Sequence, residues 1–216
     1  KKGAQKTLEQ FKTGYIQTDG YDSYNDIAAR QGIQRLGCLA HVRRKFYEAQ
    51  QSDPKRSDYA LSRFRKIYGY DEQARQLAPD ERLAYRIQHI APLYQELKGW
   101  VDEQCVKVTP KSPMGKAMTY FNNQWPKLQT LFKDGRLLID NNAIENQIRP
   151  LALGRKNYLF AGSHPAAQRI AMMYSFMASC KQQEVNPMQW LTETLNKIAD
   201  TKMSDLHTLL PGYTAD

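Results

Sequence analysis

The sequence is poor in cysteine and has no long hydrophobic run. Its three cysteines, Cys38, Cys105 and Cys180, are odd in number and far apart, which excludes a disulfide framework and suits a reducing cytoplasm. No stretch of about 18 or more apolar residues occurs, so no transmembrane helix is predicted. The sequence also shows no charged and apolar leader, no internal repeat and no low-complexity segment. We therefore expect a globular cytoplasmic protein.

Acidic residues are scarce relative to basic ones. The chain has 31 Lys and Arg residues against 22 Asp and Glu residues, a formal net charge of +9 and an isoelectric point near 9.4. This balance favours polyanionic partners, and on charge alone DNA, RNA and an anionic membrane surface all remain open. With 216 residues, of which 41% are hydrophobic, the chain can form one large domain or two small ones.

The predicted elements at the start of the chain indicate an α/β arrangement. A β-prone run at 15–18 ends at Asp19, and a second predicted strand covers 33–39. Helical patterns at 22–30 and 40–50 follow the two strands. This order builds a sheet with helices on its faces, and it places Asp19 at the carboxyl edge of a strand.

After Pro54 the strand signals give way to helical periodicity, which continues to about residue 132. An apolar stripe with alternating spacings of four and three is typical of a helix packed in a bundle. Pro92 is expected to kink or restart this helix. The stripe consists of Leu83, Ile87, Ile90, Tyr94, Leu97 and Val101.

Capping residues and prolines mark the remaining helices. Ser112 is the predicted N-cap of a helix whose buried side includes Phe121. Two more helices are predicted at 165–181 and 187–199. The last residues, 205–216, are expected to form a loosely held tail.

Residues 140–150, DNNAIENQIRP, carry the most specific chemical signal. In a helix capped by Asn142, Glu145 and Arg149 are four residues apart and share one face. A carboxylate beside a guanidinium is suited to holding a metal next to a phosphate. The alternative is a capping box, in which the Glu145 carboxylate accepts the backbone N–H of Asn142 and Arg149 is a solvated partner.

The same helix is predicted to bury one stripe and to end early. Pro150 limits the helix, so the basic pair Arg155 and Lys156 is expected in a loop. The predicted buried stripe consists of Ile144, Ile148 and Leu151.

Four motifs, each weak alone, follow one another along the chain. They are 15–24 (YIQTDGYDSY), 37–46 (GCLAHVRRKF), 140–150 and 154–163 (GRKNYLFAGS). In this order they resemble the landmarks of the insertion-sequence-66 family of bacterial DDE transposases. The resemblance covers the chain almost from end to end.

This resemblance implies both a fold and a function. The fold class is expected to be α/β, mostly helical, with a partial RNase H-like core and a large all-helical insertion. The implied activity is metal-dependent DNA cleavage and strand transfer in the transposition of an insertion sequence. An Asp-Asp-Glu triad binds two divalent cations, Mg²⁺ or Mn²⁺, in such a site. Matched position by position, Asp19 corresponds to the second aspartate and Glu145 to the glutamate.

Paired carboxylates suit this chemistry because hard oxygen ligands match Mg²⁺, and two cations roughly 4 Å apart activate the attacking oxygen and brace the leaving oxygen. The family's first aspartate has no counterpart, because no Asp precedes Asp19. Since residue 1 is Lys, we expect the chain to be a fragment, a processed product or a trimmed product. The alternative function is therefore a catalytically inactive, truncated transposase that acts only as a DNA-binding or assembly module.

The resemblance and the helical pattern together suggest four parts. Residues 1–50 are the first part of the core, and 51–134 are the helical insertion. Residues 135–200 are the remainder of the core with the Glu145 helix and the C-terminal helices, and 201–216 are a tail. The long separation between the two candidate carboxylates requires a subdomain of its own.

Basic residues near the motifs are the expected DNA contacts, although each group could also be a solvated helix face. Aromatic residues are interleaved near Arg155 and Lys156, so this part of the chain could also stack on an unpaired base. The expected partner is DNA, at the insertion-sequence ends and at the target, which makes the protein nucleoid-associated; a homo-oligomer is left open. The candidate DNA-binding residues are Arg43, Arg44, Lys45, Arg149, Arg155 and Lys156.

Cys38 and His41 form half of a tetrahedral zinc site, which needs two more ligands. None of the other Cys and His residues forms a second closely spaced pair. In the resembled family this Cys-x-x-His lies at the end of the second strand near the active site. A packing or positioning role for these two residues is the preferred interpretation. Asn142 is likewise expected to be a structural residue near the site.

Overall fold

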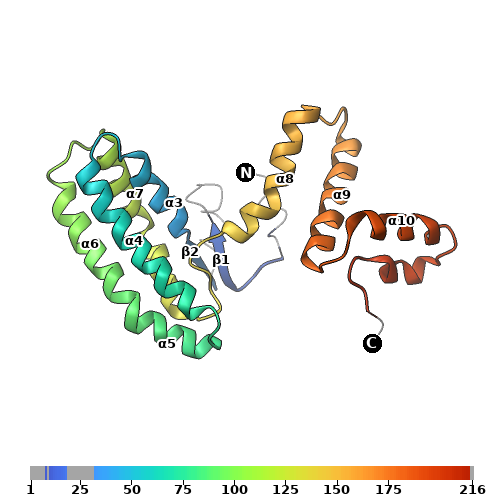
Figure 1. Cartoon of the computed structure of the whole chain (residues 1–216), viewed down its shortest axis with the longest axis horizontal. Helices are drawn as coiled ribbons and strands as arrows, with labels where there is room; N and C mark the ends of the chain where they lie inside the picture. The colour runs from blue at the N-terminus through green and yellow to red at the C-terminus, as the bar shows by residue number, and fades with distance from the viewer. Residues whose placement is uncertain (1–7, 9, 19–31, 215–216) are drawn as a thin grey trace. The chain divides into compact units, whose positions relative to one another are not determined.

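The computed structural model describes residue 8, residues 10–18 and residues 32–214. The described part is mostly helical with one small two-stranded sheet (Figure 1). The chain divides into two compact units, Lys1–Asn142 and Ala143–Asp216. Asp19 and the predicted helix at 22–30 lie outside the described residues.

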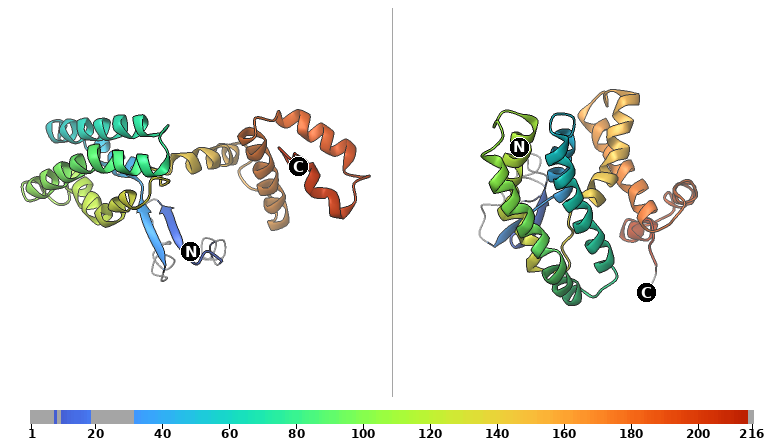
Figure 2. Two further views of the ribbon diagram at one scale, coloured as in Figure 1. Left: turned by 90° about the horizontal axis from the view of Figure 1, so that it is seen from below. Right: turned by 60° about the vertical axis from the view of Figure 1, so that its left-hand side comes forward.

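Strands β1 (Gly14–Thr18) and β2 (Ile33–Gly37) pair in parallel, as Figure 2 shows. Gly14 stands opposite Ile33, and Thr18 stands opposite Gly37. Gly14 has a positive φ of 113° and begins β1, where a side chain would be strained. Both predicted strands are confirmed, although the second ends two residues earlier than expected.

A helical bundle makes up the rest of the first unit. Its helical character was predicted, and the described residues from 60 to 125 contain no strand; that it is an insertion into a core stays a prediction. Its elements are α3 (Leu39–Glu48), α4 (Pro54–Ala74), α5 (Pro79–His89), α6 (Ala91–Cys105), α7 (Pro113–Leu128) and the 3₁₀ helix η2 (Gln129–Lys133).

The bundle core is aromatic at its centre. Phe46 of α3 lies 5.6 Å from Phe64 of α4 and 6.4 Å from Phe121 of α7, measured between ring centroids. All three side chains are buried. Aromatic pairs at these separations add attraction beyond the area that they bury, so the core fixes α3, α4 and α7 against one another.

The apolar stripe of α5 and α6 is confirmed in part. The helix is interrupted between His89 and Ala91, and Pro92 lies in the first turn of α6, as predicted from the proline. Ile87, however, is 52% exposed, and Arg86 is buried in its place. Arg86 can be buried because the carboxylate of Asp71 lies inside the bundle and pairs with its guanidinium.

The second unit contains only helices among its described residues. None of the helices in the described part of the chain combines the length and apolar character needed to cross a bilayer. The elements are α8 (Asn142–Tyr158), which starts at the last residue of the first unit, α9 (His164–Gln182), α10 (Pro187–Lys197) and the 3₁₀ helix η3 (Met203–Leu209).

Three expectations for this unit are wrong. Helix α8 runs through Pro150 to Tyr158. The fixed φ of proline is compatible with a helix, and the cost is a lost backbone hydrogen bond and crowding of the ring against the carbonyl four residues earlier. Arg155 and Lys156 are consequently helical and not in a loop. The predicted buried stripe is largely exposed, with Ile144 at 62% and Ile148 at 54%.

The end of the chain is better held than predicted. The indole N–H of Trp190 donates to the carbonyl of Leu209 at 2.9 Å, and its ring centroid lies 5.3 Å from that of Phe176. Because η3 supplies this acceptor, the residues from 203 to 209 pack against α10 and do not form a loose tail.

Candidate functional site

The strand that precedes Asp19 is tied to the segment that precedes α8. The side-chain Nε2 of Gln17 donates to the backbone carbonyl of Leu138 at 2.9 Å, across 121 positions of sequence. The backbone N–H of Leu39 donates to the carbonyl of Ile139 at 3.1 Å. Residues 138 and 139 of the segment 134–142 therefore lie alongside the carboxyl ends of both strands, within the first unit.

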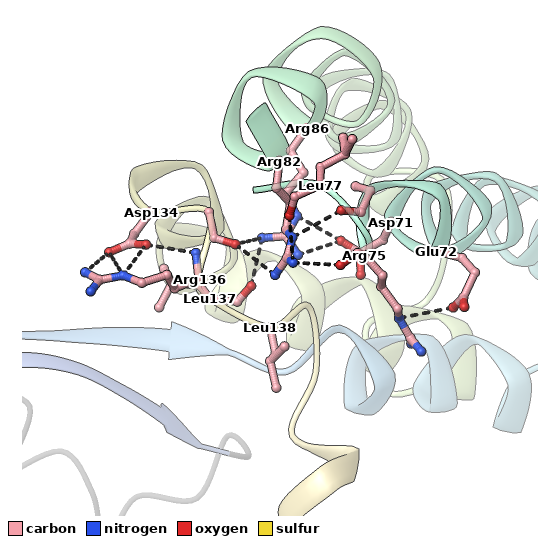
Figure 3. A network of polar contacts seen from close by, with 12 residues as sticks. Asp71, Glu72, Arg75, Leu77, Arg82, Arg86, Asp134, Arg136, Leu137 and Leu138 are labelled. Atoms are coloured by element: carbon pink, nitrogen blue, oxygen red, sulfur yellow. Dashed lines mark hydrogen bonds and ion pairs between the residues drawn. The ribbon is translucent and has the colours of Figure 1, made fainter. Parts of the chain in front are cut away.

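An ion pair inside the bundle holds the same segment from the other side (Figure 3). The guanidinium of Arg86 is 1% exposed and contacts the Asp71 carboxylate at 2.8 Å. Its Nη1 also donates to the Leu137 carbonyl at 2.7 Å. The buried charge is thus both paired and hydrogen-bonded, as burial of an ionised group requires.

Arg82 adds a second set of contacts in the same place (Figure 3). Its guanidinium donates to the backbone carbonyls of Arg75 at 2.7 Å and Leu77 at 3.1 Å, which are otherwise open acceptors beyond the end of α4. A longer contact of 3.4 Å reaches the Gly135 carbonyl. The turn between α4 and α5 and the start of the segment are therefore fixed together.

Asp140 organises the start of α8. Its carboxylate accepts hydrogen bonds from the Tyr68 hydroxyl at 3.0 Å, from the Asn142 backbone N–H at 3.1 Å and from the Asn142 side-chain Nδ2 at 2.9 Å. Asn142 was the predicted N-cap, but it is the first helical residue, and Asp140 satisfies its backbone N–H. Burial raises the pKa of the Tyr68 hydroxyl, and the Asp140 carboxylate raises it further, so this hydroxyl remains a donor.

Cys38 and His41 lie next to this segment. Cys38 occupies the N-cap position of α3 and is buried. Burial raises the pKa of its thiol, while a hydrogen bond with the backbone of Asn141 acts in the opposite direction. His41 follows in the first turn of α3 and is half-buried. The positioning role of these two residues stays a prediction. In the described ranges no group of three His, Cys, Asp or Glu residues that could hold a metal occurs.

Glu145 lies in the first turn of α8. Since α8 is helical across both positions, Glu145 and Arg149 share one face, with Glu145 half-buried and Arg149 exposed. Asp19 lies outside the described residues, so the predicted convergence of the two carboxylates stays a prediction. Among the described residues, the Asp140 carboxylate is already engaged by three donors, and Glu145 alone does not make up a two-cation site.

The predicted DNA-binding residues differ in their surroundings. Arg43 and Arg44 are exposed on α3, whereas Lys45 forms an ion pair of 3.0 Å with Glu48. In α8 the three candidate residues are all exposed, and Arg149 and Lys156 share one face because they are seven positions apart. The three are Arg149, Arg155 and Lys156.

Sequence reasoning missed Arg35, a buried arginine beside the strand end. It stands opposite Ile16 in the sheet, and its Nε donates to the Thr18 hydroxyl at 2.8 Å. The hydroxyl acceptor is on the residue immediately before Asp19. A charged residue inside a predicted strand was the available signal, because such a charge needs a partner when the strand is buried.

Comparison with protein families fits this arrangement. A family model described as Transposase IS66 family matches residues 1–169, and another described as IS66 C-terminal element matches residues 175–211. The chain belongs to the IS66 transposase family. The first IS66 match contains the sheet, the helical bundle and all of α8, and the second contains α10 and η3.

Three proteins of Sinorhizobium fredii are similar to this chain, and each is described as an uncharacterized protein. The protein y4hP is 30% identical over 215 residues, which are 92% of this chain and 39% of the relative. The protein y4qI is 30% identical over 208 residues, with the same two shares, and y4jD is 29% identical over 224 residues, 99% of this chain and 43% of the relative. The chain thus spans about two-fifths of the length of these relatives. No solved structure matches it.

Proposed function

We propose that this IS66-family chain is part of a transposase that cleaves DNA and transfers strands on a partial RNase H-like core. Asp19 and Glu145 are the proposed catalytic and metal-binding residues. The observation that carries the proposal is the hydrogen bond from Gln17 to the Leu138 carbonyl. It joins the strand leading to Asp19 to the segment leading to α8, at the carboxyl edge of a parallel sheet, where such sheets bind their ligands.

The proposed cofactor is Mg²⁺ or Mn²⁺. Bound cations of this kind lower the pKa of the attacking water or hydroxyl and neutralise charge on the leaving oxygen. Asp19, Glu145 and one further carboxylate would be needed to hold two of them. Arg149, one helical turn after Glu145, is proposed to hold a phosphate of the DNA, and the proposed place of action is the nucleoid.

The decisive test measures metal-dependent strand cleavage by a protein that carries this chain together with an upstream strand bearing an aspartate. Glu145→Gln should abolish cleavage and leave DNA affinity nearly unchanged, because it removes a metal ligand and little of the phosphate-binding surface. Glu193→Gln, an exposed change of the same kind in α10, should retain both properties. Cleavage by the Glu145→Gln protein at the unsubstituted rate would overturn the assignment.

A second proposal concerns the 216-residue chain taken by itself, within which no Asp precedes Asp19. A triad without its bridging ligand cannot clamp a second cation against the first. The 216-residue chain would then act as a DNA-binding or assembly module. We expect it to bind DNA and to leave labelled DNA uncut in Mg²⁺ or Mn²⁺. Robust cutting by the purified chain would show that another carboxylate, such as Asp140, completes the site.

A further inference from the structure

The first unit contains a pocket of about 540 Å³ between α3 and α4. This volume lies within the roughly 300–1,000 Å³ range of small-molecule sites. Arg43 and Tyr47 line it from α3, while Arg65 and Tyr68 line it from α4. Asn142, the first residue of α8, lies at its edge, three positions before Glu145.

The two helices hold the pocket in a fixed shape. The Ser57 hydroxyl donates to the backbone carbonyl of Phe46 at 2.8 Å inside the bundle. The side chain of Gln50, which also lines the pocket, donates to Asp58 at 2.9 Å. At the other end the Tyr68 hydroxyl is fixed on Asp140. The backbones of α3 and α4 and the side chains of Gln50 and Tyr68 are therefore held before any ligand arrives, which reduces the ordering cost of binding.

The two arginines of the pocket are not paired with carboxylates, although Asp58 and Asp140 hold lining residues from behind. No Asp or Glu is among its lining residues. In the part of the chain that the structure describes, the guanidinium groups of Arg43 and Arg65 have no ion pair or hydrogen bond, whereas those of Arg63 and Arg86 both have carboxylate partners. Two guanidinium groups with open donors beside one cavity form a site for an anion, and phosphate matches their forked geometry.

An aromatic ring stands beside these cations. The Tyr47 side chain is 59% exposed, and it makes no ring contact with any other described residue. The side-chain amides of Gln50 and Asn142 each use their nitrogen on a carboxylate, which leaves their carbonyl oxygens as acceptors at the pocket. A free ring and two amide acceptors suit a base, which offers a π face and N–H groups.

We propose that this pocket binds one unpaired nucleotide of a DNA strand, with its phosphate on Arg43 and Arg65 and its base against Tyr47. This inference rests on the proposed function and specifies which part of the DNA the chain recognises. A paired base cannot enter, because in a duplex its faces are covered by stacking and its edge by the partner base. The pocket therefore favours overhangs and splayed ends over intact duplex.

The test compares the affinity of the 216-residue chain for a blunt duplex with its affinity for the same duplex carrying a short single-stranded overhang. Fluorescence anisotropy gives the two dissociation constants and their ratio. The unsubstituted chain should prefer the overhang. Tyr47→Ala should lose about 5-fold or more of the affinity for the overhang, the cost of one lost base–aromatic stack, and keep its duplex affinity. Tyr47→Phe should restore the preference.

Charge is tested with matched double variants. Arg43→Ala with Arg65→Ala should weaken binding to the overhang more than binding to the duplex. Lys66→Ala with Lys116→Ala removes the same charge from exposed positions outside the pocket and should weaken both by the same factor. Far-ultraviolet circular dichroism and urea midpoints confirm folding of each variant. A 2-aminopurine base in the overhang reports stacking directly, and Tyr47→Ala should remove its quenching.

The outcomes separate the two proposals. An overhang preference and quenching that survive Tyr47→Ala would overturn the base site and leave a phosphate site at most. Equal effects of the two double variants would overturn the pocket as a DNA site altogether. Either result, with duplex binding intact, leaves the transposase proposal standing, whereas a chain that binds no DNA of any form contradicts the transposase proposal itself.

Discussion

The buried ion pair of Arg86 and Asp71 gives the sharpest prediction at the scale of single residues. Arg86→Ala leaves the Asp71 carboxylate buried without its cation and removes the donor to the Leu137 carbonyl. Breaking a buried pair on one side costs about 3–5 kcal/mol. We expect the free energy of unfolding of the first unit to fall by about that amount, measured by urea denaturation.

An exposed pair on the same bundle supplies the control. Arg75 and Glu72 are 3.1 Å apart with both side chains exposed, and such pairs contribute about 0–1 kcal/mol. Arg75→Ala should therefore leave the urea midpoint almost unchanged. If the Arg86 and Arg75 variants lost equal stability, the interior pair would not be anchoring residues 134–139.

The three cysteines should differ in reactivity. Burial raises the pKa of the Cys38 thiol and of the Cys180 thiol, which lowers the thiolate fraction at any given pH, and the thiolate is the nucleophile. Cys105 is only partly buried. Iodoacetamide at neutral pH should label Cys105 first, as read by peptide mass spectrometry, and all three should react in urea. Equal native rates would contradict the described burial.

At this scale the sequence predicted residues whose partners are close in the chain and missed those whose partners are distant. Ser112 was correctly predicted to cap α7, since its acceptor role depends on Gly115 three positions later. Arg86 was missed because its burial depends on Asp71, on another helix. The cap of α8 was misassigned for a related reason, because Tyr68 fixes Asp140 as the acceptor from 72 positions away.

At the scale of elements, two glycines should respond oppositely to alanine. An added Cβ at Gly99, on the exposed face of α6, would meet no atom within 4 Å. Removing the helix penalty of glycine should then raise the free energy of unfolding by about 0.5–1 kcal/mol. An added Cβ at Gly135 would collide with the backbone carbonyl of Pro79, so Gly135→Ala should lower it.

Thermal unfolding of both glycine variants checks this prediction. The backbone of α5 cannot move away from Gly135 without disturbing the contacts of Arg82 and Arg86 with the Gly135 carbonyl. The melting temperature should therefore rise for the Gly99 variant and fall for the Gly135 variant. A rise for both would mean that the segment after η2 is loosely packed on α5.

Element positions were the most predictable part of the fold, and element ends were less so. The helix predicted to start at residue 187 does start there as α10, where the Asn186 side chain accepts from the backbone N–H groups of Met188 and Gln189. Pro150 misled the prediction because the ring constrains φ without forbidding a helix on both sides. Propensity alone cannot decide whether a helix tolerates one lost hydrogen bond.

At the scale of the whole molecule, the net charge of +9 should make DNA affinity depend on salt. Removal of a cation that binds one phosphate lowers the slope of log affinity against log salt by roughly one. We expect Arg149→Ala, Arg155→Ala and Lys156→Ala each to do this on unrelated duplexes alike. Lys197→Ala, which removes a cation from a contact with Glu193, is the comparison. An unchanged slope would assign the α8 residues to a solvated face.

The division of the molecule was only partly accessible from sequence. The helical insertion was predicted because periodicity changes from two to about 3.6 after Pro54. The boundary between the compact units falls at Asn142, inside a continuous helix, where no composition change marks it. The candidate glutamate could be named from its motif, but the pocket of Arg43 and Arg65 could not, since it exists only where α3 packs on α4.

The bond between Gln17 and Leu138 also sets an order of events during synthesis. Ribosomes add about 5–20 residues per second, so the 121 positions between the two partners separate their synthesis by roughly 6–24 s. Helices α4 to α7 emerge in that interval; α4, α5 and α6 pack on their neighbours in sequence, which is fast, and α7 packs mainly on α3, which is already synthesised. All helices of the bundle have thus been synthesised before Leu138, the partner of Gln17, is added. The edge of the sheet proposed for catalysis closes late, when residues 134–139 leave the ribosome.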